Sequence, residues 1–582
     1  MTTKEIKNII IDLLKKTALA VLEYELKEVK LVFPPSTEMG DLGFECFALA
    51  KKLGKKPAEI ARQIAEKIQP NEIIEQITTV GPYVNFKIKR NILFKTILEE
   101  IIEKSEKFGN IEITRQGKIM VEYLSPNTNK PLHLGHLRNG ALGMAIANIL
   151  QAAGSEVIRA NLVNDRGIHI CKSMLAWQKW GEGQTPETTG EKGDHFVGRW
   201  YVRFSQEAQK NPGLEQEAQE LLQKWEAADK DVLALWQTMN AWVYGGFEKT
   251  YQKFGLHFDV LYYESKTYQL GKEIIQGGLE KRVFQKTDKG SVVFPLPEDE
   301  FGLDKDNQPK KITLIRDDGT SVYITQDLGA TVLKFKEQGV DQCIFVVGSE
   351  QKYHFRVLFK ILDTLGYAWA KNCQHLSYGM VYLPEGKMKS REGTVVDADN
   401  LITQMEKLAQ AEIEKRTPGE NAGDKALKIA NGAIKFYLLR IGAEQDIHFD
   451  PKASISFDGF TGPYCQYTYA RAKSILRAAP EKWEGQTFPY GLLGNESELL
   501  LAQKLMAFPD VLQTAADTLN PSKIANFVYE LCQTFNQFYQ KYPVLKAENP
   551  DLTNARLLLV KAVSIIIKKS LNLLNIETLE QM

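Results

Sequence analysis

The sequence lacks three features that would mark a secreted, zinc-binding or membrane protein: paired cysteines, a signal peptide and a long apolar run. Its six cysteines form no CxxC pair and stand far apart, at Cys46, Cys171, Cys343, Cys373, Cys465 and Cys532. Such spacing argues against a zinc ribbon and against a secreted disulfide framework. We therefore expect reduced, buried thiols and no structural zinc.

Targeting segments are also missing from the sequence. The opening residues MTTKEIKNIIIDLLKK place a short apolar stretch before lysines, whereas a signal peptide begins with its charges and continues into a longer apolar core. The apolar stretch 557–567 is interrupted by Lys561 and is too short to span a bilayer. These observations predict a cytoplasmic protein without a membrane segment.

No charge of either sign dominates, because Lys+Arg and Asp+Glu both total 73. A neutral total does not exclude a nucleic-acid partner, which requires only a local basic surface. Hydrophobic residues make up 43% and charged residues 25%, which is ordinary for a soluble globular protein. A chain of 582 residues exceeds one ordinary core, so about two to four domains are expected.

The sequence pattern divides the chain into three parts, over 1–112, 113–410 and 411–582. The first part predicts a small mixed domain, because its helical patterns surround an alternating stretch with a Gly-Pro turn. Its expected elements are helices over 1–29, 49–68 (around Pro57) and 90–108, and a strand over 77–88.

The middle part begins with a strand over 118–124, a helix over 141–153 and a strand over 156–163, the start of a parallel sheet. An insertion over 171–300 follows, helical from about 171 to 275. We expect the sheet to resume at 321–325, 341–348 and 375–383. From about 405 the pattern is helical. The predicted fold is an α/β Rossmann-like domain with a helical insertion, between an N-terminal α+β domain and a C-terminal all-α domain.

The segment 125–136, SPNTNKPLHLGH, follows a predicted strand and opens a helix. Backbone N–H groups at a helix N-terminus favour anions, and a nearby glycine permits close approach of a phosphate. His133 and His136 could donate hydrogen bonds to a polyphosphate, because adenylyl transfer needs mainly positioning and charge stabilisation. The alternative is a pair of loop histidines that only satisfy the backbone.

The stretch SPNTNKPLHLGHLRNG resembles the HIGH-motif segment of class I aminoacyl-tRNA synthetases, and among them the arginyl-tRNA synthetases. That family carries Ser-Pro-Asn upstream of the motif, with a lysine between. The resemblance implies that His133 and His136 contact the ATP phosphates and that Gly135 leaves room for adenine. It also assigns Ser125 and Asn127 to the arginine site, and Lys130 to phosphate neutralisation.

The segment 319–330, GTSVYITQDLGA, resembles the GTSxYxTxDLG signature of the same family. An arginine side chain is a flat fork of donors, so a selective pocket needs a carboxylate placed for two parallel hydrogen bonds. The resemblance nominates Asp327 and Glu122, with the hydroxyl of Tyr323. Asp327 could instead cap a helix over 328–336. Glu122 lies in a buried strand and should therefore have a cationic partner.

A third segment, VVGSEQKYHF over 346–355, stands at the end of an apolar strand and resembles the family pattern VVGxEQxxHF. Ligands of open α/β sheets bind at the carboxyl ends of the strands. The resemblance places Gln351 beside arginine, and Gly348 and His354 near the adenosine. The alternative is an ordinary loop between a strand and a helix.

A fourth segment, KMKSREGTVV over 387–396, resembles the class I KMSKS loop but departs from it. Ser390 stands where the motif has its second lysine. Many arginine enzymes lack that lysine, so Lys130 and Lys387 become the expected pair that neutralises phosphate. The remaining ATP-contacting candidates of this loop are Met388, Lys389 and Arg391. Without the resemblance, the stretch would be a solvated charged turn.

Two further segments resemble the tRNA-binding parts of the family. FTGPYCQYTYAR over 460–471 resembles the start of its all-α anticodon-binding domain, and VGPYVNF over 80–86 resembles the N-terminal domain that contacts the tRNA elbow. Aromatic side chains with interleaved cations suit unpaired bases, although rings at helical spacing also suit a core. The candidates are Tyr464, Tyr467, Tyr469, Arg471, Asn85 and Phe86.

The resemblance therefore implies ATP-dependent activation of arginine to arginyl-adenylate, followed by transfer to the 3′-terminal ribose of tRNA(Arg). It further implies that activation requires bound tRNA. Mg²⁺ should accompany ATP, held mainly by phosphates and water. The expected partners are tRNA(Arg), arginine and ATP, the expected state is a monomer, and no membrane partner is expected.

Three other functions stay open at this point. A related class I enzyme for cysteine or methionine would be favoured by a zinc site, which the cysteine spacing does not supply. A non-catalytic tRNA-binding paralogue would be favoured by loss of His133, His136 or Lys387, and all three are present. A small-molecule adenylyltransferase would leave the long helical region unexplained.

Overall fold

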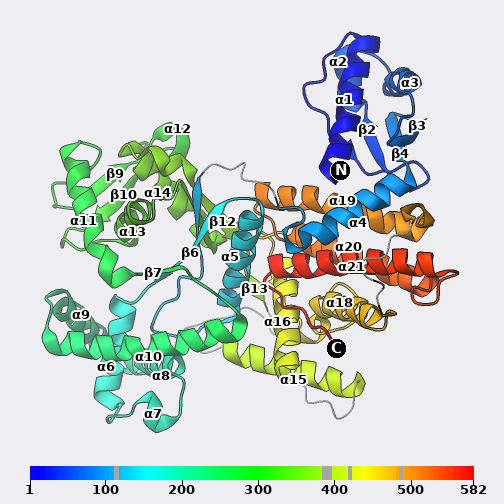
Figure 1. Cartoon of the computed structure of the whole chain (residues 1–582). Helices are drawn as coiled ribbons and strands as arrows, with labels where there is room; N and C mark the ends of the chain where they lie inside the picture. The colour runs from blue at the N-terminus through cyan, green and yellow to red at the C-terminus, as the bar shows by residue number, and fades with distance from the viewer. Residues whose placement is uncertain (111–116, 383–395, 417–422, 482, 484–488) are drawn as a thin grey trace.

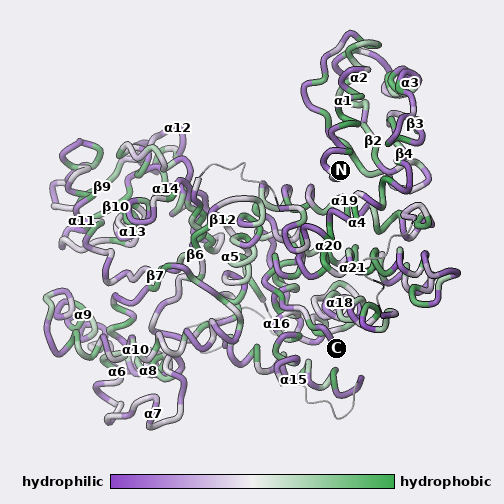
Figure 2. Tube along the Cα trace, viewed as in Figure 1, coloured by the Kyte–Doolittle hydropathy of each residue, from purple (hydrophilic) through white to green (hydrophobic). Residues whose placement is uncertain are grey.

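The computed structural model describes residues 1–110, 117–382, 396–416, 423–481, 483 and 489–582. It has an N-terminal α+β part, a central parallel sheet with helices and a C-terminal helical part (Figure 1). These are the three parts of the predicted fold class. Hydrophilic and hydrophobic residues alternate along most helices, as expected for helices with one buried face (Figure 2). No described helix is long and apolar enough to cross a membrane.

The N-terminal part packs its helices on an antiparallel sheet of order β1-β2-β4-β3. The predicted helix over 49–68 is two helices, because Pro57 starts a new one at a position where a missing N–H costs nothing. The predicted strand over 77–88 is a hairpin that turns at Gly81. The elements are α1 (Thr3–Leu22), β1 (Leu31–Val32), β2 (Leu42–Glu45), α2 (Phe47–Leu53), α3 (Pro57–Lys67), β3 (Ile74–Val80), β4 (Tyr83–Ile88) and α4 (Arg90–Lys104).

Five parallel strands form the central sheet in the order β12-β11-β5-β6-β7. Ile119 and Val121 of β5 belong to the core shared with α5 (Leu134–Ala152), while Met120 faces the core of α13 (Tyr323–Gln338) and α14 (Lys352–Thr364). Helices therefore cover both faces of the sheet, as its apolar strands require. The strands are β5 (Lys118–Glu122), β6 (Glu156–Val163), β7 (Val260–Tyr263), β11 (Gln342–Gly348) and β12 (Cys373–Tyr378).

The predicted insertion over 171–300 is not a single block. Five helices separate β6 from β7, and β7 then returns to the edge of the central sheet. The sequence pattern does not reveal β7, because a four-residue strand between helices carries too few residues to show a period. The helices of this first unit, which we call the helical insertion, are α6 (Ile168–Trp180), α7 (Pro186–Thr189), α8 (Gly193–Lys210), α9 (Gly213–Glu226) and α10 (Lys230–Phe254).

The strand predicted over 321–325 is wrong. Tyr323 starts α13 (Tyr323–Gln338), and Ile324 and Leu328 lie on one buried helical face. The actual strand is β10, in a separate antiparallel sheet of order β10-β9-β8. This second unit contains α11 (Glu264–Glu280), β8 (Gln285–Lys286), β9 (Val292–Pro295), α12 (Glu298–Phe301) and β10 (Lys311–Ile315); α14 (Lys352–Thr364) follows β11.

In the described residues of the C-terminal part, the one strand among the helices is β14, which pairs in parallel with β13 (Val381–Tyr382). The boundary expected at residue 410 falls inside α15. Its elements are α15 (Ala398–Arg416), α16 (Gly423–Leu439), β14 (Ile447–His448), α17 (Pro451–Ser454), α18 (Gly462–Arg477), α19 (Glu496–Asp517), α20 (Ser522–Lys541) and α21 (Pro550–Leu573).

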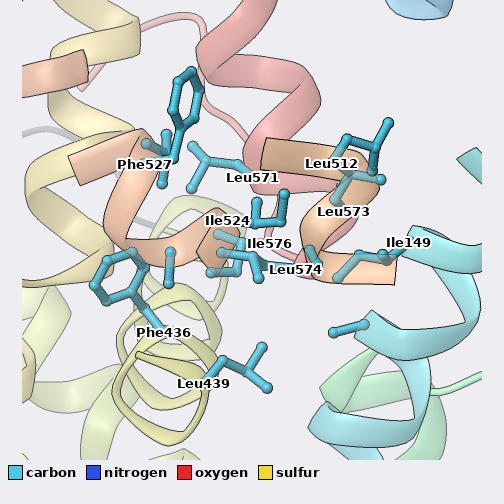
Figure 3. Close-up of a cluster of buried hydrophobic side chains, with 14 of the residues drawn as sticks. Ile149, Phe436, Leu439, Leu512, Ile524, Phe527, Leu571, Leu573, Leu574 and Ile576 are labelled. Atoms are coloured by element: carbon cyan, nitrogen blue, oxygen red, sulfur yellow. The ribbon is translucent and has the colours of Figure 1, made fainter. Parts of the chain in front are cut away.

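One continuous core joins the sheet to the helical part. Figure 3 shows Ile149 of α5 in one cluster of buried side chains with Leu439 of α16, Leu512 of α19 and Leu574 at the end of α21. These side chains are fully buried. Because α5 also packs on the sheet, this core fixes the C-terminal helices relative to the strand ends. The six cysteines form no disulfide, and all are buried except the partly buried Cys373.

Candidate active site

The candidate side chains gather where the parallel strands end. The segment 125–136 follows β5, Asp165 follows β6, Glu264 follows β7, and His354 lies just beyond β11. Because all five strands are parallel, these segments meet at one edge of the sheet. The carboxyl edge of the sheet is therefore the candidate active site.

The two histidines lie at the start of α5. His133 is the N-cap, and its Nδ1 accepts a hydrogen bond from Gly135 N at 3.1 Å. His136 Nδ1 accepts from His133 N at 3.1 Å, and the two ring centroids are 3.9 Å apart. Both Nδ1 atoms are acceptors, so a neutral ring carries its proton on Nε2, where it can be donated.

Burial keeps both imidazoles neutral. It lowers the pKa of His133 to about 4, with the nearby Lys130 acting in the same direction. Burial, His133 and Lys130 also hold the pKa of His136 well below its usual range. Near neutral pH the pair can therefore donate hydrogen bonds to an anion without themselves carrying charge. Burial likewise lowers the pKa of Lys130.

Gly135 has a local reason to be glycine. A Cβ there would lie 2.9 Å from Cε1 of His133, closer than side chains tolerate. The resemblance predicts that Gly135 leaves room for adenine, whereas the structure shows that it leaves room for the capping imidazole. The two roles are compatible, since both require the absence of a side chain.

Two asparagines that the sequence did not single out fix the backbone between β5 and α5. Leu124 and Ser125 both have positive φ angles, of 80° and 47°. Asn139 Oδ1 accepts from Leu124 N at 2.6 Å, and Asn161 Oδ1 accepts from Ser125 N at 3.1 Å. These bonds hold a backbone conformation that non-glycine residues rarely adopt. Asn139 is one turn beyond the second histidine, so its position in α5 was its only sequence signal.

Asp327 is not a helix cap, since it is the fifth residue of α13 and Val322 is the N-cap. Its Oδ2 lies 2.6 Å from Nε2 of His354. His354 was predicted to lie near adenosine, yet it contacts the carboxylate predicted for arginine. The side chain of Asp327 is still one-third exposed, so one edge remains accessible to a ligand.

Glu122 has the cationic partner that its burial required. The ammonium of Lys334, on α13, forms an ion pair with Oε2 of Glu122, and both side chains are almost completely buried. Burial opposes the charge on Lys334, but the adjacent Glu122 carboxylate raises its pKa. Asp327 acts on the same ammonium more weakly. Lys334 therefore lies within the field of both predicted carboxylates, and the charge of Glu122 is not unpaired.

A third acidic group, which the sequence did not reveal, lies near Asp327. Glu264 is buried, and this burial raises its pKa to about 7 while Arg166 opposes the shift and Asp327 adds to it. The amide of Gln326 bridges Glu264 and Arg166 when it is oriented to donate to the carboxylate, and its oxygen then accepts from Arg166 at 2.8 Å. In the sequence, the position of Glu264 directly after β7 could have indicated a site residue. That inference would have required the knowledge that β7 joins the central sheet.

The Arg166 side chain is held in place on several sides. Its guanidinium donates to Glu226 at 2.7 Å and lies 4.2 Å from the ring centroid of Tyr268. Next to it, Asp165 is buried and accepts hydrogen bonds from Ser265 and Tyr244. Arg166 and Asp165 therefore form a rigid polar wall beyond the ends of β6 and β7.

Five other predicted residues lie along the same edge. Tyr323 is 70% exposed at the first position of α13, and Gln351 is exposed at the end of the short 3-10 helix Ser349–Gln351. Asn127 is exposed and Ser125 half-buried. A Cβ on Gly348 would lie 2.4 Å from the carboxylate of Glu350, so Glu350 covers that glycine. None of these side chains is committed to the core.

Part of the KMSKS-like segment lies outside the described residues, including Lys387, Met388, Lys389 and Arg391. The residues directly after it are described and contact the start of α5. Leu134 N donates to Val396 O at 3.1 Å, and Ala398 N donates to Leu132 O at 3.0 Å. The end of this segment is therefore attached to the histidine-bearing turn.

The structure buries the two RNA-contact candidates of the N-terminal part. Phe86 is fully buried and Asn85 is 2% exposed. Consecutive residues of a strand face opposite sides of the sheet, so both faces of β4 are covered at these positions. The period-2 alternation is broken there, so the sequence could not show which side chains face solvent.

The candidates on α18 are more accessible, with one exception. Tyr469 is buried and donates to Glu580 at 2.7 Å, so it belongs to the core. Tyr464, Tyr467 and Arg471 are half-buried. The guanidinium of Arg471 lies 4.9 Å from the ring centroid of Tyr467 and donates to Asn536 at 2.6 Å.

Three family descriptions match successive parts of the chain. "tRNA synthetases class I (R), catalytic domain" matches residues 97–450. "Arginyl tRNA synthetase N terminal domain" matches residues 4–88, and "DALR anticodon binding domain" matches residues 465–582.

Individual relatives agree with these descriptions. The arginine–tRNA ligase of Treponema denticola is 43% identical over 569 residues, covering 96% of this chain and 95% of its own. That of Bacteroides thetaiotaomicron is 44% identical over 569 residues, covering 93% and 94%. Among solved structures, Thermus thermophilus arginyl-tRNA synthetase superposes with a TM-score of 0.83 at 26% identity, covering 99% of this chain and 100% of its own.

Proposed function

The chain belongs to the arginyl family of class I tRNA synthetases, and from this premise we propose how its residues activate arginine and charge tRNA. It is an aminoacyl-tRNA ligase that joins arginine to tRNA in an ATP-dependent reaction. The observation that carries the residue assignments is the geometry of the sheet edge, where a neutral histidine pair and a group of carboxylates follow neighbouring strands. The roles given below are proposals for individual side chains.

Arginine would be selected by the carboxylates beside Asp327. A guanidinium presents parallel donors that a carboxylate can accept in pairs, and its charge is permanent. Asp327 offers the accessible edge, while the hydroxyl of Tyr323 and the amide of Gln351 would complete the pocket. Lysine would leave acceptors unpaired, which is the basis of its rejection. In this proposal Glu122 stays paired with Lys334. It contributes its negative charge to the arginine site, but it does not offer two free oxygens to the guanidinium.

ATP would bind against the start of α5, where the positive end of the helix dipole and the Nε2 protons of His133 and His136 favour phosphate oxygens. An oxygen of the arginine carboxylate attacks the α-phosphorus. A P–O bond forms, the bond to the β-phosphate breaks, and pyrophosphate leaves. A hydroxyl of the terminal ribose of tRNA then attacks the carbonyl carbon of the adenylate. An ester forms, the bond between the carbonyl carbon and the phosphate oxygen breaks, and AMP leaves as the hydroxyl gives up its proton to the phosphate or to water.

Lys130 and Lys387 would neutralise the charge that develops on pyrophosphate. Lys130 lies three residues before the N-cap of α5 and already affects the pKa of both histidines, which supports its place near the phosphates. Mg²⁺ would enter with ATP and take most of its ligands from phosphate and water. This agrees with a site whose carboxylates Glu122 and Asp327 already have cationic or imidazole partners.

The flanking parts would bind tRNA. We propose that residues 1–112 contact the tRNA elbow and that the helical region over 411–582 reads the anticodon through the half-buried group Tyr464, Tyr467 and Arg471. Activation would require bound tRNA. We expect a cytoplasmic monomer, and the mass of the purified protein in solution tests the oligomeric state.

A charging assay tests the function directly. The purified protein is given ATP, total tRNA and labelled arginine, with lysine and cysteine in parallel reactions. We expect charging with arginine alone. Exchange of pyrophosphate into ATP, measured with and without tRNA, tests the dependence on tRNA. Charging with another amino acid but not with arginine would overturn the proposed pocket.

A further inference from the structure

The segment 396–398 forms a short antiparallel bridge with the histidine-bearing turn. His133 and Asp397 are bridge partners, and backbone bonds of 3.1 and 3.0 Å flank them. The carboxylate of Asp397 has two roles. Its Oδ1 accepts from Asn400 N at 2.9 Å and so caps α15, and its Oδ2 faces the helical insertion. The position of Asp397 is thus linked directly to the N-cap of α5.

The start of α8 supplies two cations to this segment. His195 Nε2 lies 3.1 Å from Oδ2 of Asp397 and 3.2 Å from Oδ2 of Asp399. Lys192 Nζ lies 2.6 Å from Asp399 Oδ2 and 3.0 Å from Asp194 Oδ2. We call these five residues the α8–α15 ionic cluster.

Neighbouring side chains and backbone contacts fix the geometry of the cluster. Thr250 of α10 accepts from Lys192 at 2.6 Å and donates to Asp399 Oδ1 at 3.0 Å. A Cβ on Gly193 would lie 1.9 Å from Trp242 O, and one on Gly246 would lie 2.3 Å from Asp194 Oδ1. Two glycines therefore let the first turn of α8 approach α10 closely enough to place Lys192 and His195. Such close packing favours a specific arrangement over a mobile surface pair.

The charges of the cluster act on the nucleotide site. Hydrogen bonds to Asp397 and Asp399 raise the pKa of His195 to about 10, so it is cationic near neutral pH. Burial opposes ionisation of Asp399, but His195 and Lys192 hold its pKa well below the usual range. Asp397 is also close enough to raise the pKa of His133, against burial and Lys130. An unpaired Asp397 would therefore place a bare negative charge beside the imidazole that faces phosphate.

We propose that Lys192 and His195 of the helical insertion are positioning residues for the nucleotide site, acting through Asp397 and Asp399. They hold the segment 396–398 against the N-cap of α5, and they neutralise carboxylates that would otherwise repel ATP. The inference rests on the proposed function of His133. A metal ion is not needed to explain the cluster of Asp194, His195 and Asp399, because the Lys192 ammonium already lies between the two aspartates.

The test compares ATP and arginine kinetics in three variants of the full chain, with saturating tRNA. His195→Gln keeps a hydrogen-bond donor but removes the charge. We expect its KM for ATP to rise about tenfold with the arginine KM within about twofold, because one partly buried carboxylate loses its cation. Adding Asp397→Asn, which can still cap α15, should bring the ATP KM back to within about threefold of wild type.

Lys172→Gln is the matched control. Lys172 pairs with Glu215 at 2.7 Å inside the same helical insertion, has a similarly low exposure and does not contact 396–398. Its kinetics should match wild type. The proposal is overturned if His195→Gln leaves the ATP KM unchanged, if it raises both KM values equally, or if Asp397→Asn does not restore the ATP KM. Failure of the wild-type chain to charge arginine would instead contradict the proposed function.

Discussion

At the scale of single residues, each buried or half-buried carboxylate of the site lies near a cationic or imidazole side chain that offsets the cost of burying its charge. Glu122 has Lys334, Asp327 has His354, and Glu264 lies near Arg166. Each pairing also fixes the orientation of a carboxylate before a ligand arrives, which lowers the entropy that binding must overcome. Asp327 in this arrangement and Lys130 beside the histidine pair have roles that kinetics can separate.

Replacement of Asp327 by Asn should weaken arginine binding selectively. The amide cannot accept two parallel hydrogen bonds from a guanidinium and carries no charge, so the arginine KM should rise about 100-fold or more. The ATP KM should change little. Steady-state charging with each substrate varied in turn measures both. Asp306→Asn, at an exposed position, is the control. An unchanged arginine KM would leave Asp327 with only its contact to His354.

Replacement of Lys130 by Ala should slow adenylate formation rather than weaken arginine binding. The charge lost is next to the histidine pair, so we expect kcat of activation to fall about 100-fold, in the range typical for loss of one transition-state contact. Pyrophosphate exchange with tRNA present gives the rate, and the arginine KM should stay within about threefold. Near-wild-type exchange would mean that Lys130 does not replace the missing lysine of the KMSKS-like segment.

At the scale of elements, α5 connects several strands to the C-terminal helices. Arg138 is fully buried in this helix and donates to four carbonyl oxygens, those of Gly379, Met380, Ala443 and Gln445, at 2.6 to 3.1 Å. Gly379 and Met380 connect β12 to β13. The Arg138 side chain therefore links the β12–β13 connection to α5 and to the chain that follows α16.

Arg138→Met should destabilise the protein by about 3 kcal/mol, because several buried carbonyl oxygens lose their donor at once. Arg138→Lys should be intermediate, since a single ammonium cannot span both pairs of carbonyls. Thermal unfolding followed by circular dichroism measures the change. Arg62→Met, at an exposed position of α3, should leave the midpoint unchanged. A loss for Arg138→Met no larger than for Arg62→Met would contradict this structural role.

At the scale of the whole molecule, the helical insertion, α16 and the C-terminal segment meet at Lys435. Its ammonium is buried, donates to Asn575 O at 2.6 Å and lies 5.0 Å from the ring centroid of Phe254 at the end of α10. Burial lowers the pKa of Lys435 to about 7, with Glu577 opposing the shift. The junction therefore contains a lysine that folding makes easier to deprotonate.

The stability of wild type relative to Lys435→Met should depend on pH. The unfolded lysine titrates near its ordinary pKa of about 10.4 and the folded one at about 7, so the unfolded state binds more protons between these values. Wild type should therefore gain stability relative to the variant as pH rises from about 7 to about 10, and the gain should be absent below pH 7. Melting temperatures of both proteins at pH 6.5, 8 and 9.5 measure it.

Lys428→Met provides the comparison for this prediction. Lys428 lies on the same helix, is partly exposed and pairs with Glu577 at 3.1 Å. We expect it to show no such gain with rising pH. A stability difference between wild type and Lys435→Met that is constant from pH 6.5 to 9.5 would show that the folded lysine keeps an ordinary pKa.

The sequence by itself determined the family, the class of fold and the segments that carry the chemistry. Local patterns sufficed for these: a strand followed by His133 at a helix start, the apolar run of β11, and the helical spacing after about residue 405. Each depends on residues close together in the chain, where periodicity and turn chemistry act directly.

Only the tertiary structure decided which side chains share a partner. The pairing of Glu122 with Lys334, the contact of His354 with Asp327 and the burial of Phe86 all join elements that are distant in sequence or depend on which face of an element is covered. The return of β7 to the sheet, which brings Glu264 to the site, is of the same kind. The physical reason is that burial and ion pairing are set by packing between elements, which no local pattern encodes.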